Sequence, residues 1–198
     1  RVALAGNVTA AMRDAGIVIS AVTASQTLIA AESARASLRP GQIYFDVNSA
    51  APSTKRAAAT IIEPSGASYV EGAVMAAVAQ PGIAVPILAG GSAAASMAEV
   101  LNALGFDITP VAEEVGRASA MKLCRSIVIK GLETLMVECA EAAKRGNVEK
   151  EVYASLAGTY PSIDWSALAD KMRERVETHG VRRSGEMMEA AEMIRDIG

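Results

Sequence analysis

Apolar and polar positions alternate in blocks along the first part of the chain. Predominantly apolar runs of strand length, the first of them rich in β-branched residues, occur at 17–22, 42–47, 68–74, 85–89 and 106–111. Segments with apolar residues at three- and four-residue spacing lie at 7–16, 27–38, 53–62 and 93–104. The runs are typical of strands buried on both faces, and the spaced segments of amphipathic helices. Strand and helix in alternation, with short connections, predict an α/β layer with parallel pairing of the first strands.

The pattern changes beyond residue 111, where no further strand is predicted. Helical segments follow at 116–144, 149–157, 162–178 and 181–197, the last two separated by Gly180. This change predicts two domains, residues 1–114 and residues 115–198, the second all-helical and entered by a long helix.

The long helix carries one apolar stripe. Its members recur at three- and four-residue steps: Met121, Cys124, Val128, Leu132, Leu135, Cys139 and Ala142. The spacing predicts that the stripe is buried. Lys122 and Ser126 lie on one flank of the same helix, with Lys122 in its first turn. Lys122 is interpreted either as a lysine facing a cleft or as a snorkelling lysine on a solvated face.

Composition limits the class of protein. The chain has 198 residues, of which 51% are hydrophobic and 21% charged, with a net charge of −3. Such values are typical of a soluble globular protein, and the lack of a basic excess argues against nucleic-acid binding. No apolar run reaches the roughly 18 residues of a membrane span, so no membrane partner is expected.

Cysteine and histidine usage exclude several kinds of site. The two cysteines, Cys124 and Cys139, lie about 22 Å apart on one predicted helix, too far for a disulfide. Both fit the predicted buried stripe, and a reducing, cytoplasmic location is expected. With His179 as the single histidine, expected near a helix end, no metal site is predicted.

The segment Asn48–Pro52 follows the carboxyl end of the second predicted strand. Open parallel sheets bind ligands at such positions, so the segment is interpreted either as part of a crevice or as a plain turn in which Ser53 caps the next helix.

Several motifs then resemble one family in their order along the chain. Asp46–Pro52 is similar to the motif Asp-x-Ser-Thr-x-x-Pro, Leu88–Gly91 to a Val-Gly-Gly segment, and Val115–Lys122 to Gly-x-Gly-x-x-x-Lys. Together with the strand Ile17–Thr23, these resemble the β-hydroxyacid dehydrogenases. The ending 179–188 resembles a subgroup of 6-phosphogluconate dehydrogenase-like, NAD-binding proteins whose C-terminal domain has no known function.

The resemblance implies a fold, a cofactor and a reaction. It implies a Rossmann-type nucleotide-binding domain followed by an all-α domain, with NAD or NADP as cofactor. A homodimer is predicted separately, from the exposed apolar faces expected on a small all-α domain attached to a long helix. The Gly-x-Gly-x-x-Gly loop of that domain is missing, so roughly the first 60 residues of the unit are expected to be absent from this sequence. The implied reaction is hydride transfer between the nicotinamide and a small hydroxyacid-type substrate.

The resemblance also implies roles for single residues. Lys122 is expected to be the catalytic acid and base, its pKa lowered by the positive end of the helix. The residues expected to contact the cofactor are Val22, Thr23, Thr27, Asn48, Ser49 and Arg183. The residues expected to contact the substrate are Met75, Ala76, Ser126 and Arg182.

The sequence departs from the family at the substrate positions. Met75-Ala76-Ala77 replaces Ser-Gly-Gly, Ser126 replaces an asparagine, and Arg183-Ser184 replaces a Lys-Asp pair. These departures keep two alternatives open: reduction of an imine or of a larger aromatic hydroxyacid, and a non-catalytic dinucleotide-binding or dimerisation module. Arg182 and Arg183 are interpreted either as residues that bind an anion or as part of a solvated helix start capped against Glu186.

Overall fold

A computed structural model describes residues 4–198, except the side chains of residues 181 and 182. The chain forms two compact units. The first contains the residues up to Leu123 together with Glu189–Gly198, and the second contains Cys124–Met188. The domain boundary predicted at 114/115 stays a prediction.

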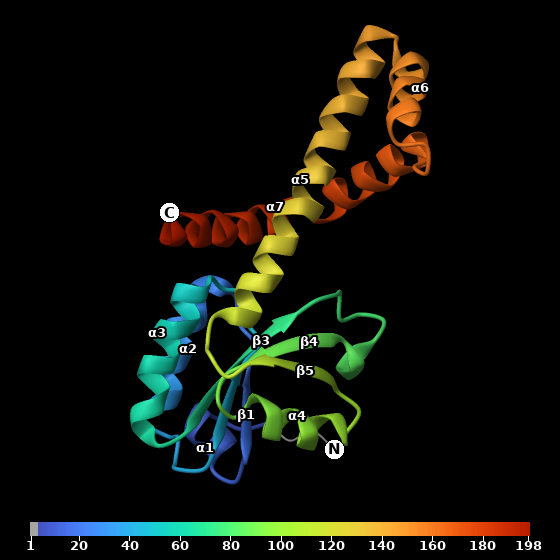
Figure 1. The fold of residues 1–198 in the computed structure, drawn as a ribbon. Helices are drawn as coiled ribbons and strands as arrows, with labels where there is room; N and C mark the ends of the chain where they lie inside the picture. The colour runs from blue at the N-terminus through green and yellow to red at the C-terminus, as the bar shows by residue number, and fades with distance from the viewer. Residues whose placement is uncertain (1–3) are drawn as a thin grey trace. The chain divides into compact units, whose positions relative to one another are not determined.

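The first unit is built on a five-stranded sheet (Figure 1). Its strands are β1 (Ile17–Ser20), β2 (Ile43–Asp46), β3 (Ser68–Val74), β4 (Pro86–Gly90) and β5 (Asp107–Ala112), in the order β1-β2-β3-β4-β5. β1, β2 and β3 pair in parallel, β3 and β4 are antiparallel, and β4 and β5 are parallel again. The predicted α/β class with a helical C-terminal part is confirmed.

Helices cover both faces of this sheet. They are α1 (Val8–Met12), α2 (Thr27–Arg35), α3 (Pro52–Ile62) and α4 (Ala94–Asn102), with short 3₁₀ turns at Ala24–Gln26, Glu63–Ser65 and Gly82–Ala84. Tyr44 and Tyr69 pack with α2 and α3 on one face, whereas Phe45 and Val70 pack with α4 on the other. Because successive strand residues point to opposite faces, a continuous apolar run supplies both cores.

The start of α3 differs from the prediction that Ser53 caps it. The N-cap is Ala51, which makes no side-chain cap bond, and Pro52 occupies the first helical position. Proline suits that position because its fixed φ is helical and its missing N–H needs no partner there. The loop before α3 therefore reaches from the end of β2 to Ala51.

Three helices make up the second unit: α5 (Arg117–Gly146), α6 (Glu149–Thr159) and α7 (Trp165–Ile197), of which α5 and α7 also extend into the first unit. Met136 and Ala140 of α5 pack against Trp165, Ala169 and Met172 of α7 in its core. The predicted break at Gly180 is wrong, because α7 continues through it. One glycine lowers helix stability by about 1 kcal/mol, which packing along a long helix outweighs. His179 is therefore an exposed mid-helix residue and not a helix end.

The predicted burial of the stripe on α5 is also wrong. Val128 is 66% exposed and Leu135 65%, Cys124 is exposed and Cys139 is partly exposed. The buried face is the adjacent one that carries Met136 and Ala140. Helical spacing shows that apolar residues share a face, but it does not show which of two neighbouring faces packs within the chain.

None of the helices in the described part of the chain is long and apolar enough to cross a membrane.

Candidate functional site

Asp46, the last residue of β2, is the centre of a buried polar cluster. Its carboxylate pairs with the Lys55 ammonium at 2.9 Å. It also accepts hydrogen bonds from the Tyr69 hydroxyl at 2.6 Å and from the backbone N–H of Asn48 at 2.9 Å. Lys55 also donates to the Asp46 carbonyl at 3.0 Å. Asp46, Lys55 and Tyr69 are essentially inaccessible to solvent, so a buried charge pair fixes the start of the loop after β2.

Burial shifts the pKa values of two members of this cluster. Desolvation lowers the pKa of Lys55, although the negative charge of Asp46 works in the opposite direction. Desolvation and the neighbouring Asp46 raise the pKa of the Tyr69 hydroxyl. The cluster was not predicted from the sequence, although a lysine within the apolar pattern of the helix at 53–62 was a signal for it.

Asn48 joins the ends of β1 and β2. Its side-chain oxygen accepts a hydrogen bond from the Val22 amide at 2.5 Å, and its side-chain nitrogen donates to the Ser20 hydroxyl at 3.2 Å. The side chain is buried, and both of its polar ends are used within the protein. Asn48 therefore fixes the positions of Val22 and of the loop that begins after Asp46.

Lys122 lies against this same loop. Its ammonium donates a short hydrogen bond to the hydroxyl of Ser49, and both side chains are partly buried. Lys122 is the sixth residue of α5, so it lies in the second helical turn and not in the first, as predicted. The structure thus brings the predicted catalytic lysine and a predicted cofactor residue into direct contact.

Glu71 of β3 holds the start of α5. One carboxylate oxygen accepts hydrogen bonds from the backbone N–H groups of Gly116 and Ala118 at 2.7 and 2.9 Å. The other accepts a hydrogen bond from the Ser119 hydroxyl at 2.7 Å. This carboxylate replaces the missing partners of the first helical amides and offsets the positive end of the helix dipole. The positive end of the dipole was expected to act on Lys122, but the negative charge of Glu71 at the same helix end opposes that effect. The role of Glu71 was not predicted from the sequence, although an acidic residue within an otherwise apolar strand was a signal for it.

Two glycines of the family motifs allow this close approach. Gly116 has a φ of +105°, and a Cβ there would lie 2.7 Å from the Arg56 guanidinium. A Cβ on Gly90 would lie 2.7 Å from the Glu71 carboxylate. Gly116 suits glycine because its φ lies in the left-handed region, and Gly90 because a side chain would displace the buried carboxylate.

The other predicted residues of the first unit lie near strand ends. Val22 and Thr23 are exposed after β1, and the buried hydroxyl of Thr27 at the start of α2 has no hydrogen-bond partner among the described residues. Met75, after β3, is partly buried and Ala76 is exposed.

The remaining predicted residues belong to the second unit. Ser126 is buried on α5. Arg183 and Glu186 lie in the middle of α7, where Arg183 pairs with Glu133 of α5 and Glu186 with Lys130 of α5. No helix starts there, so the alternative of a helix start capped against Glu186 is wrong. Arg182 falls on α7, but its side chain lies outside the described residues.

An apolar cavity of about 390 Å³ opens on one face of the sheet. Residues of β1, β2, β3 and β4 line it together with Phe106 and the segment 78–85. β1 forms one edge of the sheet, and its Ile19 is exposed.

The fold and this site define a class of protein: an open α/β domain with polar groups at the carboxyl ends of parallel strands, followed by long helices. Solved structures of other proteins have the same fold. A conserved hypothetical protein from Sinorhizobium meliloti 1021 is 41% identical with a TM-score of 0.86, over 97% of this chain and 64% of its own. The conserved protein MTH1747, described as structurally similar to 3-hydroxyacid dehydrogenases, is 34% identical with a TM-score of 0.78, over 92% of this chain and 69% of its own.

The chain therefore belongs to the 3-hydroxyacid dehydrogenase-like family, and it spans about two thirds of these relatives' length. A 3-hydroxyisobutyrate dehydrogenase from Mycobacterium tuberculosis shares the fold at 18% identity and a TM-score of 0.62, over 76% of this chain and 53% of its own. A domain of unknown function, DUF1932, matches residues 143–198. No curated protein sequence matches the chain.

Proposed function

We propose that the protein is an NAD(P)-dependent oxidoreductase in which Lys122 is the general acid and base. The observation that carries the proposal is the hydrogen bond from Lys122 to Ser49, in the loop after β2. This loop lies at the carboxyl ends of three parallel strands, where open sheets of this kind bind their ligands. The substrate class is a hydroxyacid or the corresponding carbonyl compound.

The residues at the strand ends fit a nicotinamide cofactor in part. Thr23 and Ser49 offer hydroxyls there, and Thr27 adds a buried hydroxyl without a hydrogen-bond partner in the described part of the chain. Asn48 acts by holding Val22 in place. A bound nicotinamide supplies or accepts the hydride.

The chain's own contribution is to hold a proton at the Lys122 nitrogen. Lys122 gives this proton to the substrate oxygen during carbonyl reduction and takes it back during alcohol oxidation. Ser49 fixes the direction of the ammonium, and Glu71 fixes the helix that carries it. The Asp46–Lys55 pair fixes the loop beneath Ser49.

The part of the nucleotide domain expected before residue 1 belongs to the same proposal. The greater length of both relatives supports it, as do the edge position of β1 and the apolar cavity beside it. Intact-mass measurement of the purified natural protein tests it, since a chain no longer than this sequence would contradict it.

The test of the function uses that natural protein. Titration with NADH and with NADPH measures cofactor binding, and turnover is then measured on a panel of hydroxyacids. Lys122→Ala is expected to lower kcat by at least about 100-fold while cofactor affinity persists. Lys144→Ala, on an exposed position of the same helix, is the matched control. Unchanged turnover in Lys122→Ala would exclude the assigned role.

Two alternatives have different outcomes in these measurements. Reduction of an imine or of a larger aromatic hydroxyacid is motivated by Met75 and Ser126, and the substrate panel separates it by including cyclic imines and aromatic acids. A non-catalytic module would bind NADH or NADPH, or dimerise, without turnover on any member of the panel.

A homodimer is also proposed. The exposed stripe on α5 supports it, since Val128, Leu132 and Leu135 present adjacent apolar side chains to solvent. Such a contiguous patch is uncommon on a monomer and typical of an interface.

A further inference from the structure

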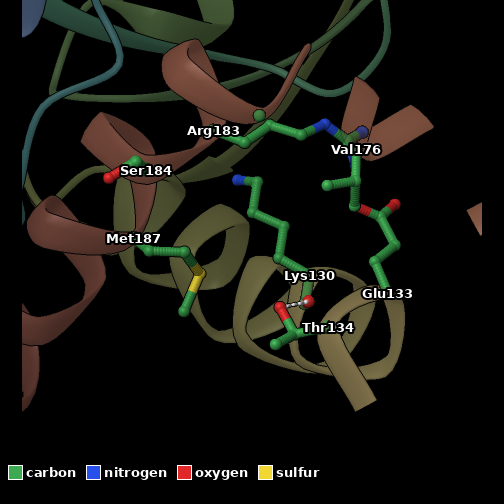
Figure 2. Close-up of a pocket in the computed structure, with 8 residues that line it drawn as sticks. Lys130, Glu133, Thr134, Val176, Arg183, Ser184 and Met187 are labelled. Atoms are coloured by element: carbon green, nitrogen blue, oxygen red, sulfur yellow. Dashed lines mark hydrogen bonds and ion pairs between the residues drawn. The ribbon is translucent and has the colours of Figure 1, made fainter. Parts of the chain in front are cut away.

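The second unit contains a cavity of about 200 Å³ between α5 and α7, shown in Figure 2. Its lining consists of Lys130, Glu133, Thr134, Val176, Gly180, Arg183, Ser184 and Met187. The space is smaller than the pockets of about 300–1,000 Å³ that hold drug-sized ligands, and it suits a small molecule of a few heavy atoms.

Charged groups meet around this cavity, and positive charge is in excess. Glu133 is only 2% exposed and pairs with Arg175 at 3.1 Å and with Arg183. Lys130 pairs with Glu186 at 2.6 Å. Among the described side chains, three cations thus share two carboxylates, which leaves one positive charge for an incoming anion.

Arg183 and Lys130 are the groups best placed to receive it. Figure 2 shows the Lys130 side chain pointing toward the Arg183 side chain. The Arg183 Nε is buried and has no hydrogen-bond partner among the described residues. A buried donor without an acceptor is costly, so an acceptor supplied by a ligand would stabilise this arrangement.

We propose that this cavity binds a small carboxylate. A guanidinium presents two parallel N–H groups that match the two oxygens of a carboxylate, and Lys130 adds a point charge. Val176 and Met187 supply apolar surface for a short carbon chain. The proposal is independent of the role of Lys122, since every residue named for this site lies within the second unit.

The experiment follows the side-chain Nε–H signal of Arg183 in ¹⁵N-labelled natural protein. The signal is assigned by its loss in Arg183→Lys, and sodium acetate is titrated against sodium chloride at constant ionic strength. A saturable shift at millimolar acetate is expected. Its absence, an equal response to chloride, or tighter binding of inorganic phosphate would overturn the proposal.

Variants sharpen the test. Lys130→Met is expected to weaken acetate binding roughly tenfold, the effect of one lost charge-assisted contact. Lys171→Met removes an equally sized charge from an exposed position of α7 and is expected to leave binding unchanged. Equal weakening in both variants would mean that acetate responds only to the overall charge of the protein, and would overturn the proposed site. The wild-type titration is decisive even if a variant folds poorly.

Discussion

Lys122 donates a hydrogen bond to the hydroxyl of Ser49, although the two residues are 73 positions apart in the chain. The bond joins the second turn of α5 to the loop after β2, so the orientation of the ammonium depends on a side chain of the sheet domain. If the proposed function is correct, Ser49 is a positioning residue for proton transfer.

Ser49→Ala is therefore expected to lower kcat roughly tenfold with little change in cofactor affinity, because the lysine loses an acceptor that helps to orient it. Steady-state kinetics over a range of pH measure the effect. Ser53→Ala is the matched control, since the Ser53 hydroxyl has no hydrogen-bond partner in the described part of the chain. Equal losses in the two variants would contradict a specific role for Ser49.

Glu71→Gln is expected to destabilise the protein by about 3 kcal/mol. The amide loses the charge and turns an N–H₂ group toward amides that need an acceptor, and a buried donor facing donors is costly. Urea unfolding measures the change, with the exposed Glu63→Gln as control. A loss below about 0.5 kcal/mol would show that the cap at the start of α5 is dispensable.

Lys55→Met is expected to cost about 3 kcal/mol, because it leaves the Asp46 carboxylate buried beside Tyr69 without its cation. The double variant Asp46→Asn with Lys55→Met removes both charges, and it is expected to be more stable than Lys55→Met alone. Strictly additive losses in this double-mutant cycle would mean that the two residues are not energetically coupled.

Tyr69 predicts a dependence of stability on alkaline pH. Its native pKa is raised above the usual 10.0, so the native state keeps a proton that the unfolded state releases, and stability falls as the pH rises beyond 10. Lys55 has a lowered native pKa and acts in the opposite direction at pH values between that pKa and its usual 10.5. Tyr69→Phe removes only the first effect.

The difference between wild type and Tyr69→Phe in the free energy of unfolding is therefore expected to shrink as the pH rises from 9 to 11. Urea midpoints at each pH measure it. A difference that stays constant over this range would show that Tyr69 ionises equally in the native and unfolded states.

The exposed stripe on α5 predicts the oligomeric state. Leu135→Glu is expected to convert a dimer to a monomer at micromolar concentration, since a charge would be buried at the centre of an apolar interface. Light scattering measures the mass, and Glu138→Gln, an exposed change on the same helix, is the control. A monomeric wild-type protein would contradict the proposed dimer.

The sequence alone determined the alternation of strands and helices and the change to helices only, because apolar runs and helical spacing are local properties of the chain. It also indicated the loop after β2 and Lys122 as candidate site residues, because short motifs can be recognised in a sequence before the fold is known. Only the tertiary structure decided which face of α5 is buried, that α7 runs through Gly180, and that Glu71 and Lys55 are buried charged groups. These features depend on contacts between residues far apart in the chain, and a local pattern carries no information about the partner of a buried charge or of an apolar face.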